Sequence, residues 1–144
     1  MNSEFFEIMV NTGPGPFDLI AGVRRVGDDL LVAMWGGHKP HIGAVAVAQS
    51  RASIQNADRR SATASTFCFL GHKEDELAKA VSLKLAATLD TKVVVTAGMH
   101  WENISAEGIE TVIENSNALT DLILEALSAG SLNSGVEKGG RLNI

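Results

Sequence analysis

The chain has 144 residues, of which 45% are hydrophobic and 5% aromatic, and its formal net charge is −5 at pH 7. This length corresponds to one domain, which can bury roughly two thirds of the surface that its unfolded chain exposes. The acidic balance argues against a nucleic-acid partner, because binding to a phosphate backbone requires a clustered basic face. No apolar run approaches the ~20 residues that span a bilayer, so no membrane segment is expected.

The N-terminal stretch and the cysteine usage indicate a cytoplasmic protein. Met1–Val10 has neither the basic start nor the long apolar stretch of a signal peptide. The single Cys68 cannot form an internal disulfide, and it lies in the apolar stretch Phe67–Leu70, where a buried and inert thiol is expected. We therefore assign no chemistry to Cys68.

The first half of the chain has the pattern of antiparallel strands. Turn signals at Asn11–Pro16 and Gly27–Asp29 separate short apolar and β-branched runs, and Arg51–Arg60 reads as an exposed loop. This spacing predicts a meander of five strands at residues 4–10, 17–26, 30–35, 42–48 and 63–70.

The second half changes period. Apolar residues recur every four positions from Leu77 to Leu89, which predicts an amphipathic crossover helix over Glu74–Leu89. Lys92–Ala97 has the composition of a sixth strand. A second long helix is predicted from Ser105, a good N-cap residue, to just before Gly130.

These elements predict an α+β fold: a largely antiparallel sheet of about six strands, whose last pair is parallel through a crossover helix, with two long helices packed on it. Residues 1–130 form a single domain in this interpretation. Residues 131–144 are rich in Gly, Ser and Asn and are expected to be a flexible tail.

All four histidines and both tryptophans fall in three short Gly-containing segments, Trp35–His41, Gly71–Glu74 and Gly98–Asn103. In the predicted sheet, the third, fifth and sixth strands end at the edge where the fourth begins, provided that the sixth strand belongs to the same sheet. The three segments would then converge. Strand-to-helix loops at this edge would also direct the free N–H groups of a helix start toward it, which suits an anion.

Each segment taken singly has a simpler interpretation. Pro40 excludes the helical geometry that a helix-borne metal pair of His38 and His41 would need, and a polar loop explains the pattern equally well. His72 and Lys73 could be a solvated helix start. The combination is more specific, because Trp35 and Trp101 flank imidazoles and two lysines, as in a site that stacks an aromatic ring and neutralises a phosphate.

Three blocks also carry a family resemblance: GGHKPHIGAVAVA at 36–48, GHKE at 71–74 and AGMHWENIS at 97–105. They resemble the LpdD-type prenylated-flavin chaperones, a family of small accessory proteins first named for gallate decarboxylase, and the similarity extends from Glu4 to about Leu127. Where the family has Gly-Ile-His followed by a nearby Asp, this chain has Met99 and Glu102, so no role is carried over to Glu102.

The resemblance implies a homodimeric accessory protein, not an enzyme. Such a protein would bind prenylated FMN, or FMN, and assist its maturation in or delivery to a UbiD-type (de)carboxylase, with a flavin prenyltransferase as a further partner. Lys39 and Lys73 are assigned to the phosphate, and the Trp and Met side chains to the ring system. The implied cofactor site comprises Trp35, Gly37, His38, Lys39, His41, Gly71, His72, Lys73, Met99, His100 and Trp101.

Two other functions remain open at this stage. A metal-dependent enzyme would use two or three of the four histidines as ligands, with Glu74 or Glu102 as general base, although lysines in the same loops would repel a cation. A purely structural assembly protein would tolerate alanine at His38, His41 and His72 together.

Overall fold

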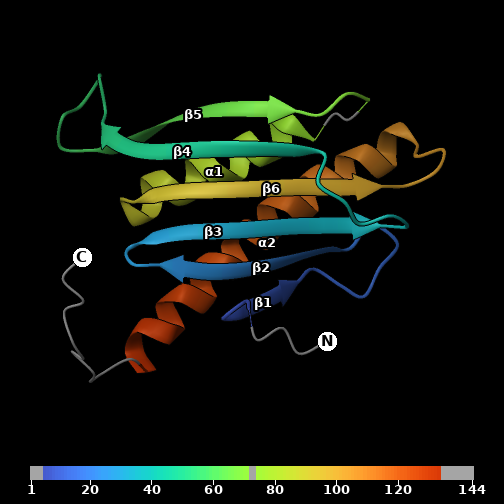
Figure 1. Cartoon of the computed structure of the whole chain (residues 1–144), viewed down its shortest axis with the longest axis horizontal. Helices are drawn as coiled ribbons and strands as arrows, with labels where there is room; N and C mark the ends of the chain where they lie inside the picture. Colours follow the sequence, from blue (N-terminus) through green and yellow to red (C-terminus); the bar gives the residue numbers. More distant parts are fainter. Residues whose placement is uncertain (1–4, 72–73, 134–144) are drawn as a thin grey trace.

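The computed structural model describes residues 5–71 and 74–133. His72, Lys73 and residues 134–144 of the predicted tail lie outside the described residues. These described residues form one six-stranded sheet and two helices (Figure 1). The strands are β1 (Ile8–Asn11), β2 (Leu19–Val26), β3 (Asp29–Gly37), β4 (Ala44–Ala52), β5 (Arg60–Cys68) and β6 (Lys92–His100), and the helices are α1 (Asp75–Leu89) and α2 (Ala106–Asn133).

The strand order is β1-β2-β3-β6-β4-β5. All neighbouring pairs are antiparallel except β3 and β6, which are parallel. The predicted α+β class is therefore confirmed, as is a largely antiparallel sheet with one parallel pair. The predicted parallel neighbour was wrong: β5 and β6 run in the same direction, but β4 lies between them, and β6 separates β3 from β4.

Side-chain chemistry explains this order. β6 carries valine at three successive positions, Val93, Val94 and Val95, so both of its faces are apolar and it belongs in the centre of the sheet. β5 has the sequence RSATASTFC, whose polar side chains tolerate water at a sheet edge.

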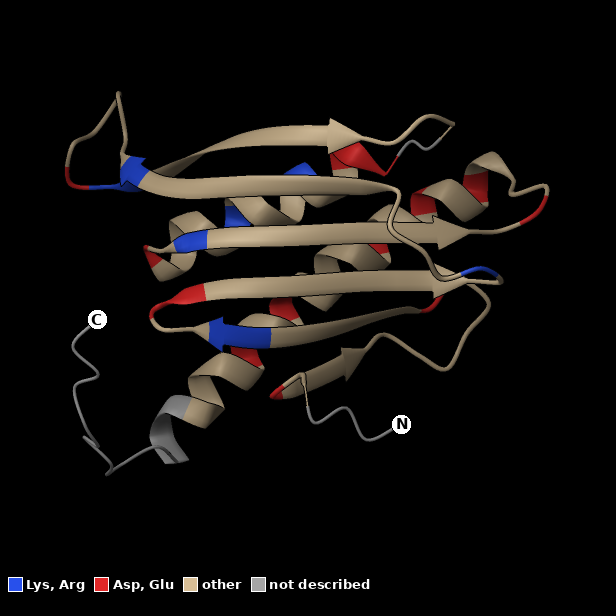
Figure 2. Cartoon of the chain, viewed as in Figure 1, with Lys and Arg blue, Asp and Glu red and all other residues tan. Residues whose placement is uncertain are grey.

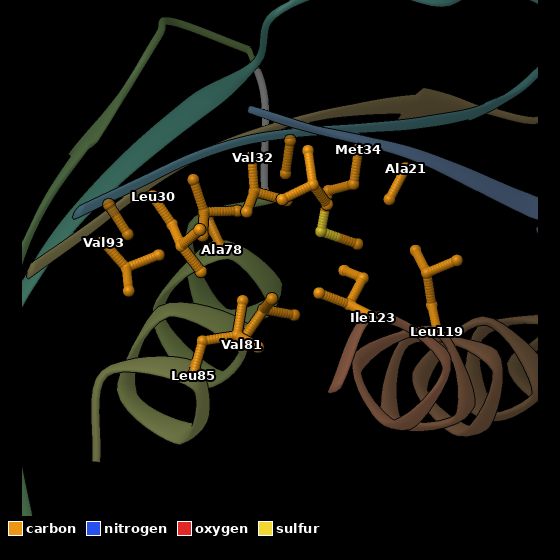
Figure 3. Close-up of a cluster of buried hydrophobic side chains, with 14 of the residues drawn as sticks. Ala21, Leu30, Val32, Met34, Ala78, Val81, Leu85, Val93, Leu119 and Ile123 are labelled. Carbon is orange, nitrogen blue, oxygen red and sulfur yellow. The ribbon is translucent and has the colours of Figure 1, made fainter. Parts of the chain in front are cut away.

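Both helices cover the same face of the sheet, and the hydrophobic core lies between this face and the helices (Figures 1 and 3). Alternate residues of the central strands point toward the helices and are almost fully buried. Each of the larger side chains contributes about 1.5–3 kcal/mol on burial. The labelled core side chains are Ala21, Leu30, Val32, Met34 and Val93 of the sheet, Ala78, Val81 and Leu85 of α1, and Leu119 and Ile123 of α2.

The start of α2 follows a local capping rule. Ser105 Oγ accepts the N–H of Gly108 at 3.0 Å, which confirms Ser105 as the N-cap of α2. The predicted end of α2 before Gly130 was wrong, because the helix continues to Asn133. A single glycine weakens a helix by only about 1 kcal/mol, and no proline follows to stop it. Residues 131–133 of the predicted tail are thus helical.

The C-terminal ends of β3, β5 and β6 and the start of β4 lie at the same end of the sheet, on the right in Figure 1. We call this row of strand ends the site edge. This arrangement confirms that the segment after β3 and the segment after β6 come together. Among the described residues, no helix is both long and apolar enough to cross a membrane.

Candidate functional site

Backbone hydrogen bonds join the predicted segments at the site edge. His38 N–H donates to the His100 carbonyl at 2.8 Å, and Gly43 N–H donates to the Ala97 carbonyl at 2.9 Å. The Gly43 carbonyl in turn accepts the N–H of Phe69 at 2.9 Å. The loop between β3 and β4 therefore crosses the end of β6 and contacts the end of β5.

Glycines at this crossing allow the backbones to approach closely. A Cβ on Gly98 would overlap the carbonyl of His41, and a Cβ on Gly43 would lie 2.5 Å from Glu74 Oε2. Gly37 has a φ of +79°, a left-handed conformation that favours glycine. These glycines thus allow the loop after β3, the end of β6 and the start of α1 to approach one another closely.

His41 and Glu74 form the polar centre of the crossing. His41 Nδ1 lies 2.7 Å from the Lys39 carbonyl, and Nε2 lies 3.1 Å from Glu74 Oε1. Glu74 Oε1 also accepts the N–H of Met99 at 3.3 Å, and the Glu74 side chain is only 9% exposed. A carbonyl can only accept, so Nδ1 is the donor in the contact with Lys39, and Nε2 faces the carboxylate of Glu74.

A cavity of about 460 Å³ opens at the site edge between α1, α2 and the end of β6. We call it the helix-side cavity. Its size is typical of a small-molecule site, and most of its lining is apolar, with His100 and two carboxylates as the polar groups. It is lined by Gly71, Glu74, Glu76, Leu77, Met99, His100, Trp101, Ile104, Ile109, Val112 and Ile113.

A second hollow lies on the other face of the sheet. Trp35, Gly37 and His38 line a cavity of about 300 Å³ there. Trp35 also lines a neighbouring cavity of about 670 Å³, whose polar lining includes Asp18 and Asn11 but, among the described residues, no histidine, lysine or arginine. This larger cavity is therefore less suited to an anion than the helix-side cavity.

The structure thus divides the predicted site residues between two faces. Gly71, Met99 and His100 line the helix-side cavity, whereas Trp35, Gly37 and His38 line the opposite hollow. Trp101 lines both, and its position is fixed by a hydrogen bond from Nε1 to the Pro16 carbonyl at 2.9 Å. His41 lies between the two faces in its contact with Glu74, and Lys39 is exposed.

Sequence reasoning missed the contribution of α2 to this site. Ile109, Val112 and Ile113 line the helix-side cavity, although their spacing indicated only a core-facing helix. Ile109 and Ile113 remain 49% and 47% exposed. The signal available in the sequence was the width of the apolar stripe on α2, which exceeds the width needed to cover the core.

Charge is distributed unevenly between the two edges of the sheet (Figure 2). Lys39 lies at the site edge, whereas Arg51, near the end of β4, and Arg60, at the start of β5, lie at the opposite edge. At that opposite edge, the Ser50 hydroxyl and then Arg60 lower the pKa of Asp90, and the Thr91 hydroxyl is the largest cause of the lowered pKa of Asp29.

A metal site is not supported. Within residues 5–71 and 74–133, no three His, Cys, Asp or Glu side chains are grouped to hold a metal ion. His38 and His100 meet through a backbone hydrogen bond but line different cavities, and the His41 ring faces Glu74.

The fold is that of an α+β protein with a mostly apolar cavity of about 460 Å³ at the ends of its central strands. Residues 13–128 match the model of the prenylated flavin chaperone LpdD-like domain family. The match covers most of the chain, so the chain belongs to this family. No curated protein matches it significantly. The family resemblance of the three sequence blocks is thereby confirmed, and all three lie within the matched range.

Proposed function

We propose that this chain binds prenylated FMN in the helix-side cavity and assists its maturation in, or delivery to, a UbiD-type (de)carboxylase. The observation that carries the proposal is the mostly apolar cavity of about 460 Å³ with His100 in its lining, in a chain of the prenylated flavin chaperone family. In this role the protein is an accessory factor and not the enzyme, and its cytoplasmic location is part of the proposal.

The lining suits a prenylated ring system. Leu77, Ile109 and Ile113 offer aliphatic surface, and Met99 and Trp101 offer polarisable and aromatic surface for a flat ring. When bound, the flavin carries the redox chemistry, and the protein supplies binding, orientation and exclusion of water. FMN without the prenyl group would leave part of this apolar lining unfilled.

The phosphate end of the ligand needs cationic or N–H donors. His100 lines the cavity mouth, and Lys39 is exposed on the adjoining loop, which bonds to the His100 carbonyl through His38. The carboxylate of Glu76 would repel a phosphate. We therefore assign the phosphate to the Lys39 and His100 side of the mouth, and Lys73 remains a sequence-based prediction for the same role.

A carrier must also release its ligand. The cavity opens at the site edge, where Ile42 is 58% and Leu70 is 99% exposed. Exposed apolar side chains beside a cavity mouth are suited to a transient protein contact. In the proposed order of events, a flavin prenyltransferase first supplies the ligand, and the decarboxylase then binds at the site edge to receive it.

The test is coexpression with a flavin prenyltransferase, followed by anaerobic purification, absorption spectroscopy and native mass spectrometry. The wild-type chain should retain prenylated FMN. His100→Ala and Ile113→Glu should lose it, because they remove a polar contact and place a charge in the apolar lining. His38→Ala is the matched control: it removes a neighbouring exposed imidazole that lines the opposite hollow, so binding should persist.

A wild-type chain without flavin would overturn the proposal. Loss of flavin from His38→Ala with retention in His100→Ala would instead place the ligand in the hollow beside Trp35. Transfer is measured separately, by mixing the loaded chain with an apo decarboxylase and following the flavin mass on each protein. Flavin that never leaves the loaded chain would contradict delivery.

A further inference from the structure

A cavity of about 670 Å³ on the face of the sheet opposite the helices has no part in the proposed function (Figure 1). Ile20 of β2 and Trp35 of β3 form its floor: they pair across the two strands and alternate with core-facing residues. Among the described residues, this cavity and the helix-side cavity share no lining residue. It is therefore a separate cavity, which we call the outer cavity.

Two aromatic rings form one side of the outer cavity. The ring of Phe6 rests on Gly22, where a Cβ would lie only 2.6 Å from the ring Cγ. Phe6 and Trp35 have ring centroids 6.2 Å apart and planes inclined at 39°, and both line the cavity. The face of an aromatic ring carries negative potential and attracts a cation within about 6 Å of its centroid. This side of the cavity is therefore suited to a cation with an apolar body.

The loop between β1 and β2 adds a carboxylate to the outer cavity. Asp18 lines the cavity, and its Oδ2 accepts the N–H of Gly15 at 2.6 Å. A Cβ on Gly13 would overlap the same oxygen, so the carboxylate fits there because residue 13 is glycine. Two hydrogen bonds between Thr12 and Leu19, of 2.9 and 3.1 Å, close the base of the loop. The carboxylate thus has a defined position.

This carboxylate has no cationic partner in the part of the chain that the structure describes. None of the ion pairs there includes Asp18, and no lysine or arginine of that part lines the cavity. Arg24, two residues beyond Gly22 on β2, is held elsewhere. It donates to the Phe5 carbonyl at 2.7 Å, and its guanidinium carbon lies 5.1 Å from the centroid of the Phe5 ring. The negative charge of Asp18 is therefore available to a ligand.

We infer that the outer cavity is a second ligand site, which binds a small organic cation. The ammonium group of this ligand pairs with Asp18, and its aliphatic or aromatic body packs against Phe6 and Trp35. The volume of the cavity lies within the range of small-molecule sites. The carboxylate repels a phosphate, which makes the site selective against the flavin. The inference does not rest on the proposed function, because the two ligands take different cavities.

The test is a titration of the full chain, followed by nuclear magnetic resonance, with three probes that share one phenyl ring: benzyltrimethylammonium, benzyl alcohol and benzoate. The chain has only two tryptophans, so the indole N–H signal of Trp35 is assigned by its loss in Trp35→Phe. Benzyltrimethylammonium should shift this signal and bind at least about tenfold more tightly than benzyl alcohol, and benzoate should bind most weakly.

Asp18→Asn isolates the contribution of the charge. It keeps an oxygen for the Gly15 N–H and removes the negative charge. Benzyltrimethylammonium should therefore bind at least about tenfold more weakly, while benzyl alcohol binds as before. Asp58→Asn, in the exposed loop between β4 and β5, is the matched control because it changes the net charge equally. It should bind all three probes as the wild type does.

The comparison of the three probes on the wild type does not depend on the folding of any variant. A wild type that does not bind benzyltrimethylammonium at millimolar concentration would overturn the inference, as would equal affinity for all three probes. Unchanged binding in Asp18→Asn would also contradict it. Shifts confined to the helix-side cavity, with the Trp35 signal unmoved, would place the cation beside Glu76 and refute the outer cavity as its site.

Discussion

His41 Nε2 lies 3.1 Å from Glu74 Oε1, a contact between residues that are 33 positions apart in the chain. The carboxylate is held a second time by the N–H of Met99. One side-chain pair therefore connects the loop after β3, the start of α1 and the end of β6. Because Glu74 and Met99 both line the helix-side cavity, this pair positions part of its lining.

Removal of the carboxylate should destabilise the protein. Glu74→Ala leaves the Met99 N–H without this acceptor and removes the partner of His41 Nε2, which lowers the free energy of unfolding by about 2–3 kcal/mol. Denaturant unfolding followed by circular dichroism measures this difference. Glu76→Ala, nearby in the first turn of α1 and exposed, should change the stability by less than about 0.5 kcal/mol. Equal effects of the two variants would contradict a structural role of this pair.

The close approach of His41 to β6 predicts a strong effect of Gly98→Ala. The added Cβ overlaps the His41 carbonyl, and backbone cannot move aside as a flexible side chain does. The free energy of unfolding should fall by about 3 kcal/mol. Gly71→Ala is the comparison, since no atom lies within 4 Å of its Cβ and only the strain of its positive φ, about 1–2 kcal/mol, applies. Chemical denaturation measures both, and a Gly98→Ala variant as stable as wild type would show that the loop can relocate.

The class of the fold could be predicted from sequence because periodicity reports local structure. The four-residue repeat from Leu77 to Leu89 and the N-cap Ser105 define helices without any tertiary information. The place of β6 between β3 and β4 could not be obtained in this way, because a crossover helix permits several positions in the sheet. The run Val93–Val95 was the available hint, since apolar residues on both faces of a strand favour the sheet centre.

The sequence predicted at which end of the sheet the candidate site lies, but not which of its residues share a face. Strand direction alone brings His38 and His100 to the same edge, and the structure agrees. Which face each side chain takes depends on the register of β3 against β6, where Trp35 pairs with Gly98 and Gly36 with Met99. A shift of one residue would reverse those faces, and the strand sequences alone do not specify this register.

The lowered pKa of Asp29 predicts a pH-dependent contribution to stability at the opposite edge. The Thr91 hydroxyl, 3.0 Å from Asp29 Oδ1, is its largest cause. Because the folded pKa lies below the unfolded one, this contribution is present above about pH 4 and is lost as the pH falls through the folded pKa. Thr91→Val should therefore lower Tm at pH 7, and the difference should shrink in strong acid to the part that comes from the lost hydrogen bond to the Asp28 carbonyl, which is 2.6 Å long.

Thermal unfolding of both proteins from neutral pH into strong acid provides the measurement. Thr88→Val, exposed on α1, serves as the control and should track the wild type at every pH. A Tm difference for Thr91→Val that stays constant across this whole range would assign the effect to packing and not to the carboxylate.

The continuation of α2 through Gly130 predicts a stabilising substitution. Gly130 lies inside the helix, and the nearest atom to its Cβ position is Arg25 Nη2 at 3.5 Å, an ordinary contact with a flexible side chain. Gly130→Ala therefore restricts the unfolded chain and improves helix propensity without a clash, and should raise the free energy of unfolding by about 0.5–1 kcal/mol. If α2 ended at Gly130 in a left-handed cap, the same change would destabilise the protein by a similar amount. The sign of the change in urea unfolding thus distinguishes a continuous helix from a capped one, and a shift in far-ultraviolet circular dichroism toward more helix would accompany only the first.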